Sequence, residues 1–143
     1  MYFKLNLVVL LCSSMLFGCE MYEEPIITQQ TQMLIGNWVS PEYNDTIVTF
    51  KRSDQLIEQK YGLAIMDEGN LMERKNAGWC GTPPIFFADF EGEWTNSGSD
   101  IYINVAYWGG AADYHWKIVS LSKNKLTIAR IEENYHQEQE PPE

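Results

Sequence analysis

Residues 86–94 read Phe-Phe-Ala-Asp-Phe-Glu-Gly-Glu-Trp, and their pattern decides the fold. Every second residue from Phe86 to Trp94 is apolar or small, whereas most of the positions between them are acidic. Because successive side chains of a β-strand point to opposite faces, this alternation predicts a strand with one buried face and one face in water. Such half-buried strands are typical of antiparallel sheets.

The same alternation recurs in residues 101–108 and 126–131, and turn-forming clusters of Gly, Asn, Asp and Ser separate the runs. The predicted fold is all-β: a single small eight-stranded antiparallel up-and-down barrel, whose closure leaves no exposed sheet edge. Such a barrel has room for side chains or for one small ligand. The predicted strands lie near residues 34–40, 45–52, 57–66, 70–76, 86–95, 100–108, 113–122 and 125–132.

The segment from Ser53 to Lys60 is the ambiguous part of this assignment. Ser53 and Asp54 are residue types that cap helix N-termini, so a helical turn is the alternative to a strand there. We find no convincing helical period elsewhere in residues 19–143.

The N-terminus has the organisation of a secretory signal. Lys4 supplies a positive charge, and Leu5 to Phe17 form an apolar run shorter than the roughly 20 residues that a membrane-spanning helix needs. The sequence Leu-Phe-Gly-Cys that ends at Cys19 resembles the bacterial lipobox. This resemblance implies cleavage before Cys19 and attachment of lipid to its sulfur and its amine. Two or three acyl chains hold a protein stably at a bilayer, so we expect a soluble domain anchored to the membrane through Cys19.

Composition divides the chain into four segments. Residues 1–18 are the predicted signal peptide, 19–32 a polar tether, 33–132 the barrel and 133–143 an acidic flexible tail. The net charge is −10, and it becomes −11 once Lys4 leaves with the signal peptide. So acidic a domain argues against partners such as nucleic acid or anionic lipid headgroups. We expect a monomer.

Gly36 and Trp38 stand at the start of the first predicted strand, within Leu-Ile-Gly-Asn-Trp at residues 34–38. Gly-x-Trp at this place resembles the lipocalins. The resemblance implies that Trp38 packs across the closed base of the barrel with an arginine over its ring. Arg130, in the last predicted strand, is our candidate for this cation–π contact, within about 6 Å.

Further motifs make the chain similar to small lipocalin-like lipoproteins of Bacteroidota. That resemblance implies a Gram-negative envelope with the outer membrane as the expected location, facing either the periplasm or the cell surface. Glu20, Glu23 and Glu24 resemble the surface-export signal of that phylum. The chain is shorter than true lipocalins and has no predicted C-terminal helix, so no lipocalin ligand carries over. The motifs lie at residues 61–62, 69–70, 73–76, 78–85, 92–94 and 107–110.

Cys80 is the one cysteine used neither by the signal peptide nor for lipidation. Without a partner for an internal disulfide, it is either a buried small hydrophobe or a free thiol. It lies in a loop, residues 79–84, that Pro83 and Pro84 stiffen. Two interpretations of this loop stay open: a rigid crossover in which Trp79 plugs one end of the barrel, or the rim of a binding site.

Candidate catalytic residues are scarce. The two histidines, His115 and His136, have no spacing typical of a metal site, and we predict no cofactor. An enzyme is the least favoured alternative. It would require His115 to lie within hydrogen-bond reach of Cys80 or of a buried carboxylate.

Aromatic residues make up 13% of the chain and concentrate near Gly109 and Gly110. The predicted function is binding of a small apolar or sugar-like ligand, and the alternative is a protein-interaction or inhibitor module of the envelope. An interior pocket of at least about 300 Å³ would favour a ligand, whereas a filled barrel with an exposed aromatic patch would favour a partner. The candidate ligand-binding residues are Trp79, Tyr107, Trp108, Tyr114 and Trp116.

Overall fold

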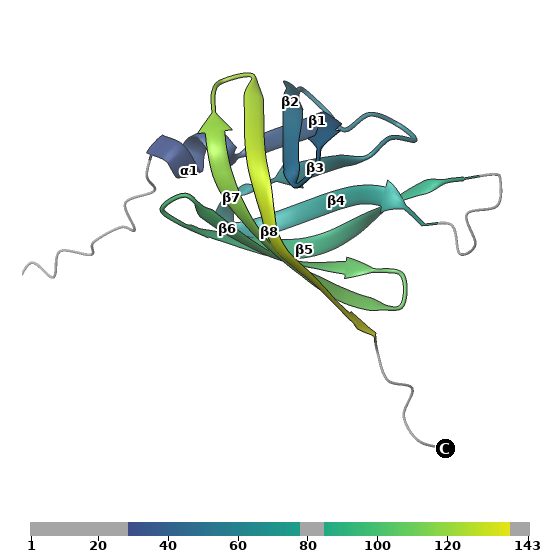
Figure 1. The fold of residues 1–143 in the computed structure, drawn as a ribbon. Coiled ribbons are helices and arrows are strands. Elements are labelled where there is room, and N and C mark those ends of the chain that lie inside the picture. The colour runs from purple at the N-terminus through teal and green to yellow at the C-terminus, as the bar shows by residue number, and fades with distance from the viewer. Residues whose placement is uncertain (1–28, 78–84, 138–143) are drawn as a thin grey trace, which may run out of the picture.

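The computed structural model describes residues 29–77 and 85–137, and within them the chain forms a closed antiparallel β-barrel (Figure 1). This confirms the predicted all-β fold and, for the described residues, the eight strands. The strands are β1 Gly36–Asn44, β2 Ile47–Ser53, β3 Gly62–Ile65, β4 Asn70–Asn76, β5 Phe87–Ser97, β6 Asp100–Tyr107, β7 Gly110–Leu121 and β8 Lys125–Gln137. A helix, α1 Gln29–Leu34, precedes β1, and a short 3-10 turn, η1 Asp67–Gly69, joins β3 to β4.

Around the barrel the strands follow the order β1-β2-β8-β7-β6-β5-β4-β3. From β3 to β8 each strand pairs with the next one along the chain, as in the predicted meander. β3, however, pairs with β1 and not with β2, while β2 closes the barrel on β8. The simple up-and-down order therefore has one exception, because the connection from β2 to β3 must cross β1.

This connection, residues 54–61, passes over the outer face of β1. Val39 alternates with the inward-facing Trp38 and so points outward, yet it is buried. Leu56 approaches it closely. A Cβ atom added at Gly62 would lie 2.9 Å from Leu56 Cδ2 and 3.3 Å from Val39 Cγ1, so glycine leaves the room that the crossing needs.

The crossing accounts for the weakest part of the sequence assignment. The predicted strand at 57–66 begins only at Gly62, and the residues before it form neither a strand nor a helix. They turn instead: Lys60 N–H donates to the Ile57 carbonyl over 3.4 Å, and Gln59 adopts a φ of 54°. The chain has to reverse direction over β1 before β3 can enter its ladder, which the local sequence pattern does not reveal.

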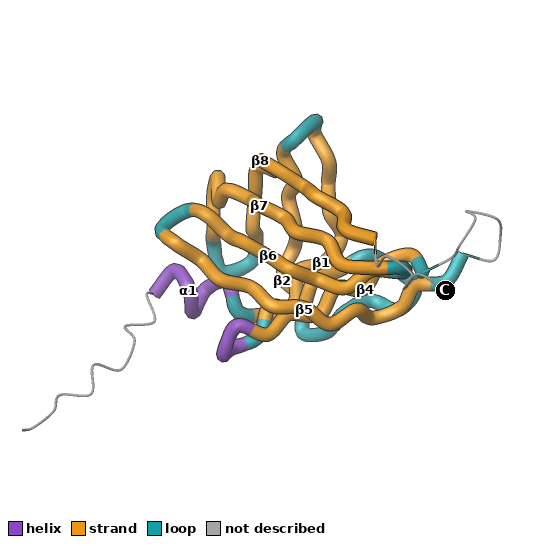
Figure 2. The backbone as a smooth tube through the Cα atoms, turned by 90° about the horizontal axis from the view of Figure 1, so that it is seen from below, coloured by secondary structure: helices purple, strands orange, loops and turns teal. Residues whose placement is uncertain are grey.

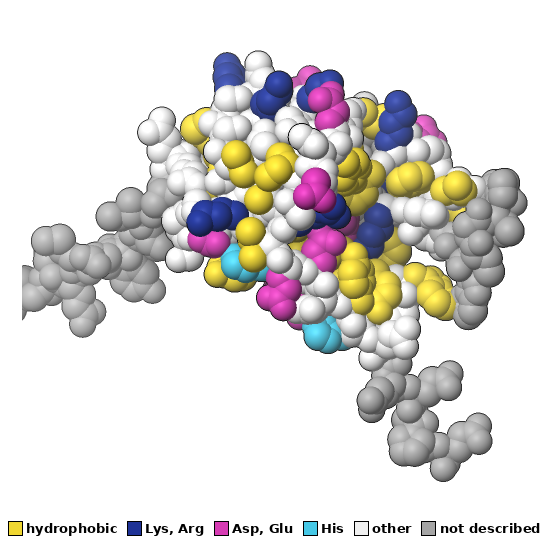
Figure 3. Space-filling view, in the orientation of Figure 1, with side chains coloured by type: hydrophobic (Ala, Val, Ile, Leu, Met, Phe, Trp, Pro, Cys, Tyr) yellow, Lys and Arg dark blue, Asp and Glu magenta, His cyan; other side chains and the backbone are white. Residues whose placement is uncertain are grey.

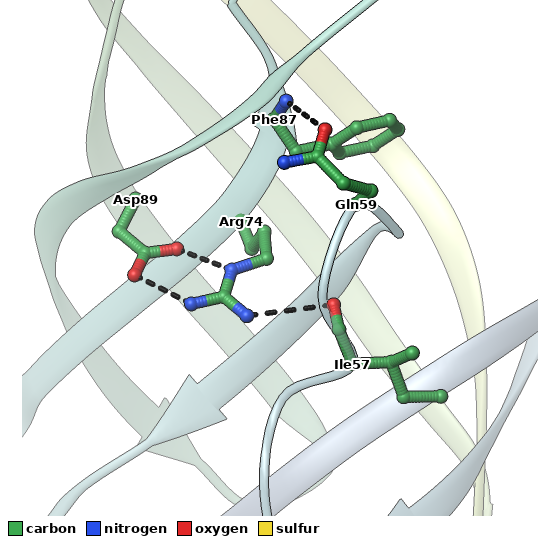
Figure 4. A network of polar contacts seen from close by, with 5 residues as sticks. All are labelled: Ile57, Gln59, Arg74, Phe87 and Asp89. Atoms are coloured by element: carbon green, nitrogen blue, oxygen red, sulfur yellow. Dashed lines mark hydrogen bonds and ion pairs between the residues drawn. The ribbon is translucent and has the colours of Figure 1, made fainter.

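Side chains of β4 and β5 hold the crossing in place (Figure 4). Arg74 donates from Nε and Nη2 to the two carboxylate oxygens of Asp89, over 2.6 and 2.7 Å, and from Nη1 to the Ile57 carbonyl over 3.4 Å. The Gln59 side chain accepts a hydrogen bond from the Phe87 backbone N–H at 3.2 Å. The bidentate pair with Asp89 orients the Arg74 guanidinium, so that its remaining nitrogen can donate to the crossing segment.

Two segment boundaries differ from the sequence prediction. The predicted tail at 133–143 begins too early, because β8 continues to Gln137 and pairs with the start of β7. The predicted tether at 19–32 ends too late, because Gln30 and Thr31 already belong to α1. The Gln30 side chain bonds to Gly98 in the turn between β5 and β6, and the Thr31 side chain bonds to Asn96 at the end of β5. Figure 2 also places the helix beside this turn. A six-residue helix is too short to show a period in the sequence.

The base of the barrel, defined as the end next to α1, is closed by Trp38 and Arg52. Trp38 is fully buried, and its indole N–H donates to the Leu34 carbonyl at 2.7 Å. The Arg52 guanidinium lies 4.2 Å from the centroid of the Trp38 ring. It also donates to three backbone carbonyls, those of Met33, Ile35 (2.7 Å) and Lys123 (2.6 Å).

The predicted contact between Arg130 and Trp38 is therefore wrong, and Arg52 takes that place. The register explains the difference, since Trp38 of β1 stands directly opposite Arg52 of β2. Arg130 pairs with Trp116 farther along β8, towards the other end of the barrel, and its guanidinium lies 5.8 Å from the Tyr43 ring.

Arg52 also explains the glycine of the Gly-x-Trp motif, because its guanidinium leaves no room for a side chain at position 36. A Cβ atom at Gly36 would lie 2.1 Å from Arg52 Nη1, and the residue has a φ of +144°, which side-chain-bearing residues rarely adopt. The motif is thus a steric requirement of the closed base.

We predict that Arg52→Met lowers the free energy of unfolding by about 3 kcal/mol, because three carbonyls lose a charged donor and Trp38 loses its cation. The matched change Arg130→Met should cost about 1 kcal/mol, since Arg130 donates to one backbone carbonyl, that of Asp45, whereas Arg52 donates to three. Urea unfolding followed by tryptophan fluorescence measures both. Equal losses, or a larger loss for Arg130→Met, would contradict this assignment.

Candidate functional site

The mouth of the barrel, defined as the end opposite α1 (Figure 1), carries the β1–β2 and β6–β7 turns and the end of β8. Here the barrel encloses a cavity of about 200 Å³, which we call the mouth cavity. It has the volume of about seven liquid waters, below the roughly 300 Å³ of typical ligand pockets. Its lining consists of Tyr43, Val48, Phe50, Tyr61, Glu73, Lys75, Tyr114, Trp116, Ile128, Arg130, Glu133 and Tyr135.

Glu73 lies deep in this cavity, with 2% of its surface exposed. It accepts hydrogen bonds from Tyr61 Oη at 2.7 Å and Tyr114 Oη at 3.3 Å, and Lys75 Nζ donates to it at 2.6 Å. A buried carboxylate is strongly destabilising unless it is paired in this way. Burial is the main cause that raises the pKa of Tyr61 well above its usual value, followed by the neighbouring Glu73 carboxylate.

Lys75, the cation of this pair, is surrounded by aromatic rings. Its ammonium lies 5.2 Å from the centroid of Phe90, 5.9 Å from that of Tyr107 and 6.0 Å from that of Tyr114. Each distance is within the range of a cation–π contact. The ammonium is therefore held by one carboxylate and three rings, which fixes a positive charge on the wall of the cavity.

Aromatic side chains form most of the remaining lining. Trp116 stacks on Tyr114 with a centroid distance of 5.4 Å and faces Phe50 at 6.3 Å. Tyr135 meets Tyr114 edge to face at 6.2 Å, and it meets Tyr107 in the same way at 5.5 Å. Trp116 and Tyr114 are 3% and 6% exposed, so their stacked faces mainly cover one another, whereas Tyr135 is 59% exposed.

Arg130 and Glu133 provide a second pair of charges on the lining. The closest approach of the two side chains is 3.9 Å, between Arg130 Nη1 and Glu133 Oε2. Arg130 Nη2 donates to the Asp45 carbonyl at 3.0 Å, and Trp116 Nε1 donates to Glu133 Oε1 at 3.4 Å. Arg130 Nε is buried, and among the described residues it is the one buried side-chain nitrogen or oxygen that has no hydrogen-bond partner.

The structure brings together three of the five candidate ligand-binding residues. Tyr114 and Trp116 line the mouth cavity, and Tyr107 contacts Lys75 and Tyr135 beside it. Trp108 lies on the adjacent turn with 52% of its surface exposed and is not part of the lining. Trp79 lies outside the described residues, as do Cys80, Pro83, Pro84 and the lipidation candidate Cys19.

Sequence reasoning missed the charged half of the site. Glu73 and Lys75 were not singled out, and Arg130 was assigned to the base. A signal was present: on β4 the inward series continues from Leu71 to Glu73 and Lys75, which places two charges on an otherwise apolar face. Phe50, Tyr61 and Tyr135 were missed because nothing local distinguishes a lining aromatic residue from a core one.

His115 lies on the outer face of the sheet, away from the mouth cavity. Its ring stacks on Tyr102 at 4.6 Å, and Nε2 is 2.8 Å from Asp100 Oδ1. The Asp100 side chain is 31% exposed, so it is not the buried carboxylate that an enzyme would need, while the other candidate, Cys80, is outside the described residues.

His136 approaches Asp113 on the same outer face, at 2.8 Å. Hydrogen bonds from Asn104 and His136 lower the pKa of Asp113. Figure 3 shows the two histidines (cyan) beside acidic side chains (magenta) on one face.

Two larger hollows, of about 360 and 900 Å³, lie along this outer surface and are open to solvent. The mouth cavity is the better candidate because buried charges converge in it.

No model of a known protein family matches the chain, and neither a curated protein nor a solved structure matches it. The closed eight-stranded barrel itself is compatible with a lipocalin-like fold. Within residues 29–77 and 85–137 no helix has the length and apolar character needed to cross a membrane. The same residues contain no group of three or more His, Cys, Asp or Glu side chains placed to hold a metal ion.

We predict that Lys75→Met lowers the free energy of unfolding by about 3 kcal/mol, because it leaves a buried carboxylate without its cation. The double variant Glu73→Gln/Lys75→Met should recover at least about 1 kcal/mol of this loss, since it removes both charges. Urea unfolding of the wild type, both single variants and the double variant gives the coupling energy. Additive losses would show that the pair does not act as a unit.

Proposed function

We propose that this protein is a lipid-anchored, non-enzymatic binding protein of the bacterial cell envelope, whose barrel holds one small ring-bearing molecule at its mouth. At about 200 Å³ the mouth cavity is smaller than the pocket of about 300 Å³ that would favour a ligand by size, so the proposal rests on the charged and aromatic side chains that line it. The base of the barrel is packed with apolar side chains, whereas the mouth combines a cavity, aromatic faces and buried charges. Concave apolar sites with a few convergent polar groups are the usual form of a ligand site.

The cavity volume limits the ligand to a single ring with its substituents. At about 200 Å³ it is smaller than pockets that hold drug-sized molecules. The Tyr135 ring, which is 59% exposed on the lining, suits a flat apolar ring or one face of a sugar. The Glu73 carboxylate is already engaged by Tyr61, Lys75 and Tyr114, so it is placed to hold the wall together and not to transfer a proton.

The proposed anchor rests on the lipobox-like sequence that ends at Cys19. Cys19 stands ten residues before Gln29, where α1 begins, and α1 lies at the closed base. The described chain would thus be joined to the lipid from the base, with the mouth at the opposite end. This arrangement suits a protein that takes its ligand from the aqueous side.

A second candidate function, docking of an envelope protein, is favoured by the rim of the mouth. Large apolar side chains there are between 52% and 61% exposed, a combination that often marks protein interfaces. These rim residues are Tyr43, Ile85, Phe86, Trp108, Ile131 and Tyr135.

Native mass spectrometry of the full-length protein, purified from its own organism, tests the proposed function. We expect a retained ligand mass, which Ile128→Phe should abolish because the larger side chain fills the mouth cavity. Ile118→Phe is the matched control: Ile118 pairs with Ile128 across β7 and β8 but does not line the cavity, so the ligand should remain. A ligand-free mass with a co-purifying protein would replace the proposal by the second candidate.

The anchor has its own test. Cys19→Ser should abolish incorporation of labelled palmitate and leave an unprocessed precursor, since the lipid has lost its attachment point. Cys12→Ser and Cys80→Ser are the matched controls and should be labelled normally. Normal labelling of Cys19→Ser would show that the N-terminal assignment is wrong.

A further inference from the structure

The mouth cavity carries more information about its ligand than size and aromatic character. Its lining has four charged side chains, and their hydrogen-bond capacity is filled to different degrees. The Glu73 carboxylate accepts from three donors, and Lys75 donates to it while facing three rings. This pair is therefore internally satisfied and has little to offer a ligand.

Glu133 is also engaged. One of its oxygens accepts a hydrogen bond from Trp116 Nε1, and the other faces Arg130. The 3.9 Å separation is an ion-pair distance and not a hydrogen bond, so Arg130 is the electrostatic partner of Glu133 Oε2 without saturating it.

Arg130 differs from the other three. A guanidinium carries five N–H donors in a fixed planar fork. The structure pairs Nη2 with the Asp45 carbonyl, while Nη1 is 3.9 Å from Glu133 and Nε is buried without a partner. A buried donor without an acceptor is rare in folded proteins, and each case calls for an explanation. Nε has almost no exposed surface, so the donor that a ligand in the cavity can reach is Nη1, which lies 3.9 Å from Glu133, beyond hydrogen-bond distance.

We propose that the ligand carries one carboxylate, which Arg130 binds through Nη1, while the ring lies beside the exposed Tyr135. A carboxylate is the acceptor that suits a guanidinium, because a charge-assisted hydrogen bond is roughly twice as strong as a neutral one. This inference deepens the proposed function and rests on it. The ligand class is a small ring bearing an acid group, aromatic or sugar-derived.

Two matched pairs of probes test the charge alone. Benzoate and benzamide are nearly the same size and shape and differ in charge, and glucuronate and glucose make the same comparison for a sugar ring. Affinities for the full-length protein in lipid nanodiscs are measured by titration with saturation-transfer NMR. We expect the acid of at least one pair to bind about tenfold or more tightly than its neutral partner, the usual size of a charge-assisted hydrogen bond.

Variants assign this preference to Arg130. Arg130→Gln should reduce the ratio of the two affinities to about one, whereas Arg130→Lys should keep part of it, because the charge stays and the fork is lost. Lys51→Gln removes one positive charge from an exposed site outside the cavity and should leave the ratio unchanged. Near-UV circular dichroism verifies that each variant is folded, and a purely structural role of Arg130 would not alter the ratio.

The possible outcomes separate the two proposals. Equal affinities of acid and neutral compound overturn the inference, and so does a preference that survives in Arg130→Gln. In either case the proposed function stands if native mass spectrometry finds a neutral ligand. If no ligand mass is retained and no probe binds, both fail.

Discussion

The Arg52 guanidinium at the base of the barrel is the contact on which the rest of the structure depends. It covers the buried Trp38 ring and donates to carbonyls of the α1–β1 junction and of the β7–β8 turn. The Met33 carbonyl is one of them, and it lies in the last turn of α1, where backbone carbonyls have no partner within the helix. One side chain thereby joins the N-terminal helix, the first two strands and the last hairpin. The strand order places it there, because β2 lies between β1 and β8.

A closed base allows the opposite end to be incompletely packed. The apolar core from Leu34 to Ile128 fills the barrel near α1, and the side chains become polar and aromatic towards the mouth. The crossing of residues 54–61 over β1 adds a second packed layer on the outer face of the barrel. It buries Val39 from outside and is tied down by Arg74, so the wall beside the cavity is supported from both faces.

The sequence was sufficient for the fold class, because strand periodicity is a local property that repeats through the chain. It did not predict the partner of Trp38 or the crossing of β1, since both depend on which strands become neighbours. Arg52 and Arg130 each lie on a strand beside apolar residues, and only the register distinguishes them. The site shows the same limit. Tyr114 and Trp116 were found because aromatic residues cluster in the chain, whereas Glu73 and Lys75 were not singled out as site residues.

The charges at the mouth are difficult to explain by stability alone. Apolar side chains of similar volume usually stabilise a fold as well as a buried ion pair does, or better. This barrel nevertheless keeps Glu73 and Lys75 inside and leaves Arg130 Nε buried without an acceptor. Departures of this kind from consistent packing concentrate at functional sites, where the unfilled capacity serves a molecule that the chain does not itself supply. The Glu73–Lys75 pair then forms part of the cavity wall, while the Asp45 carbonyl and Glu133 position Arg130 on the lining.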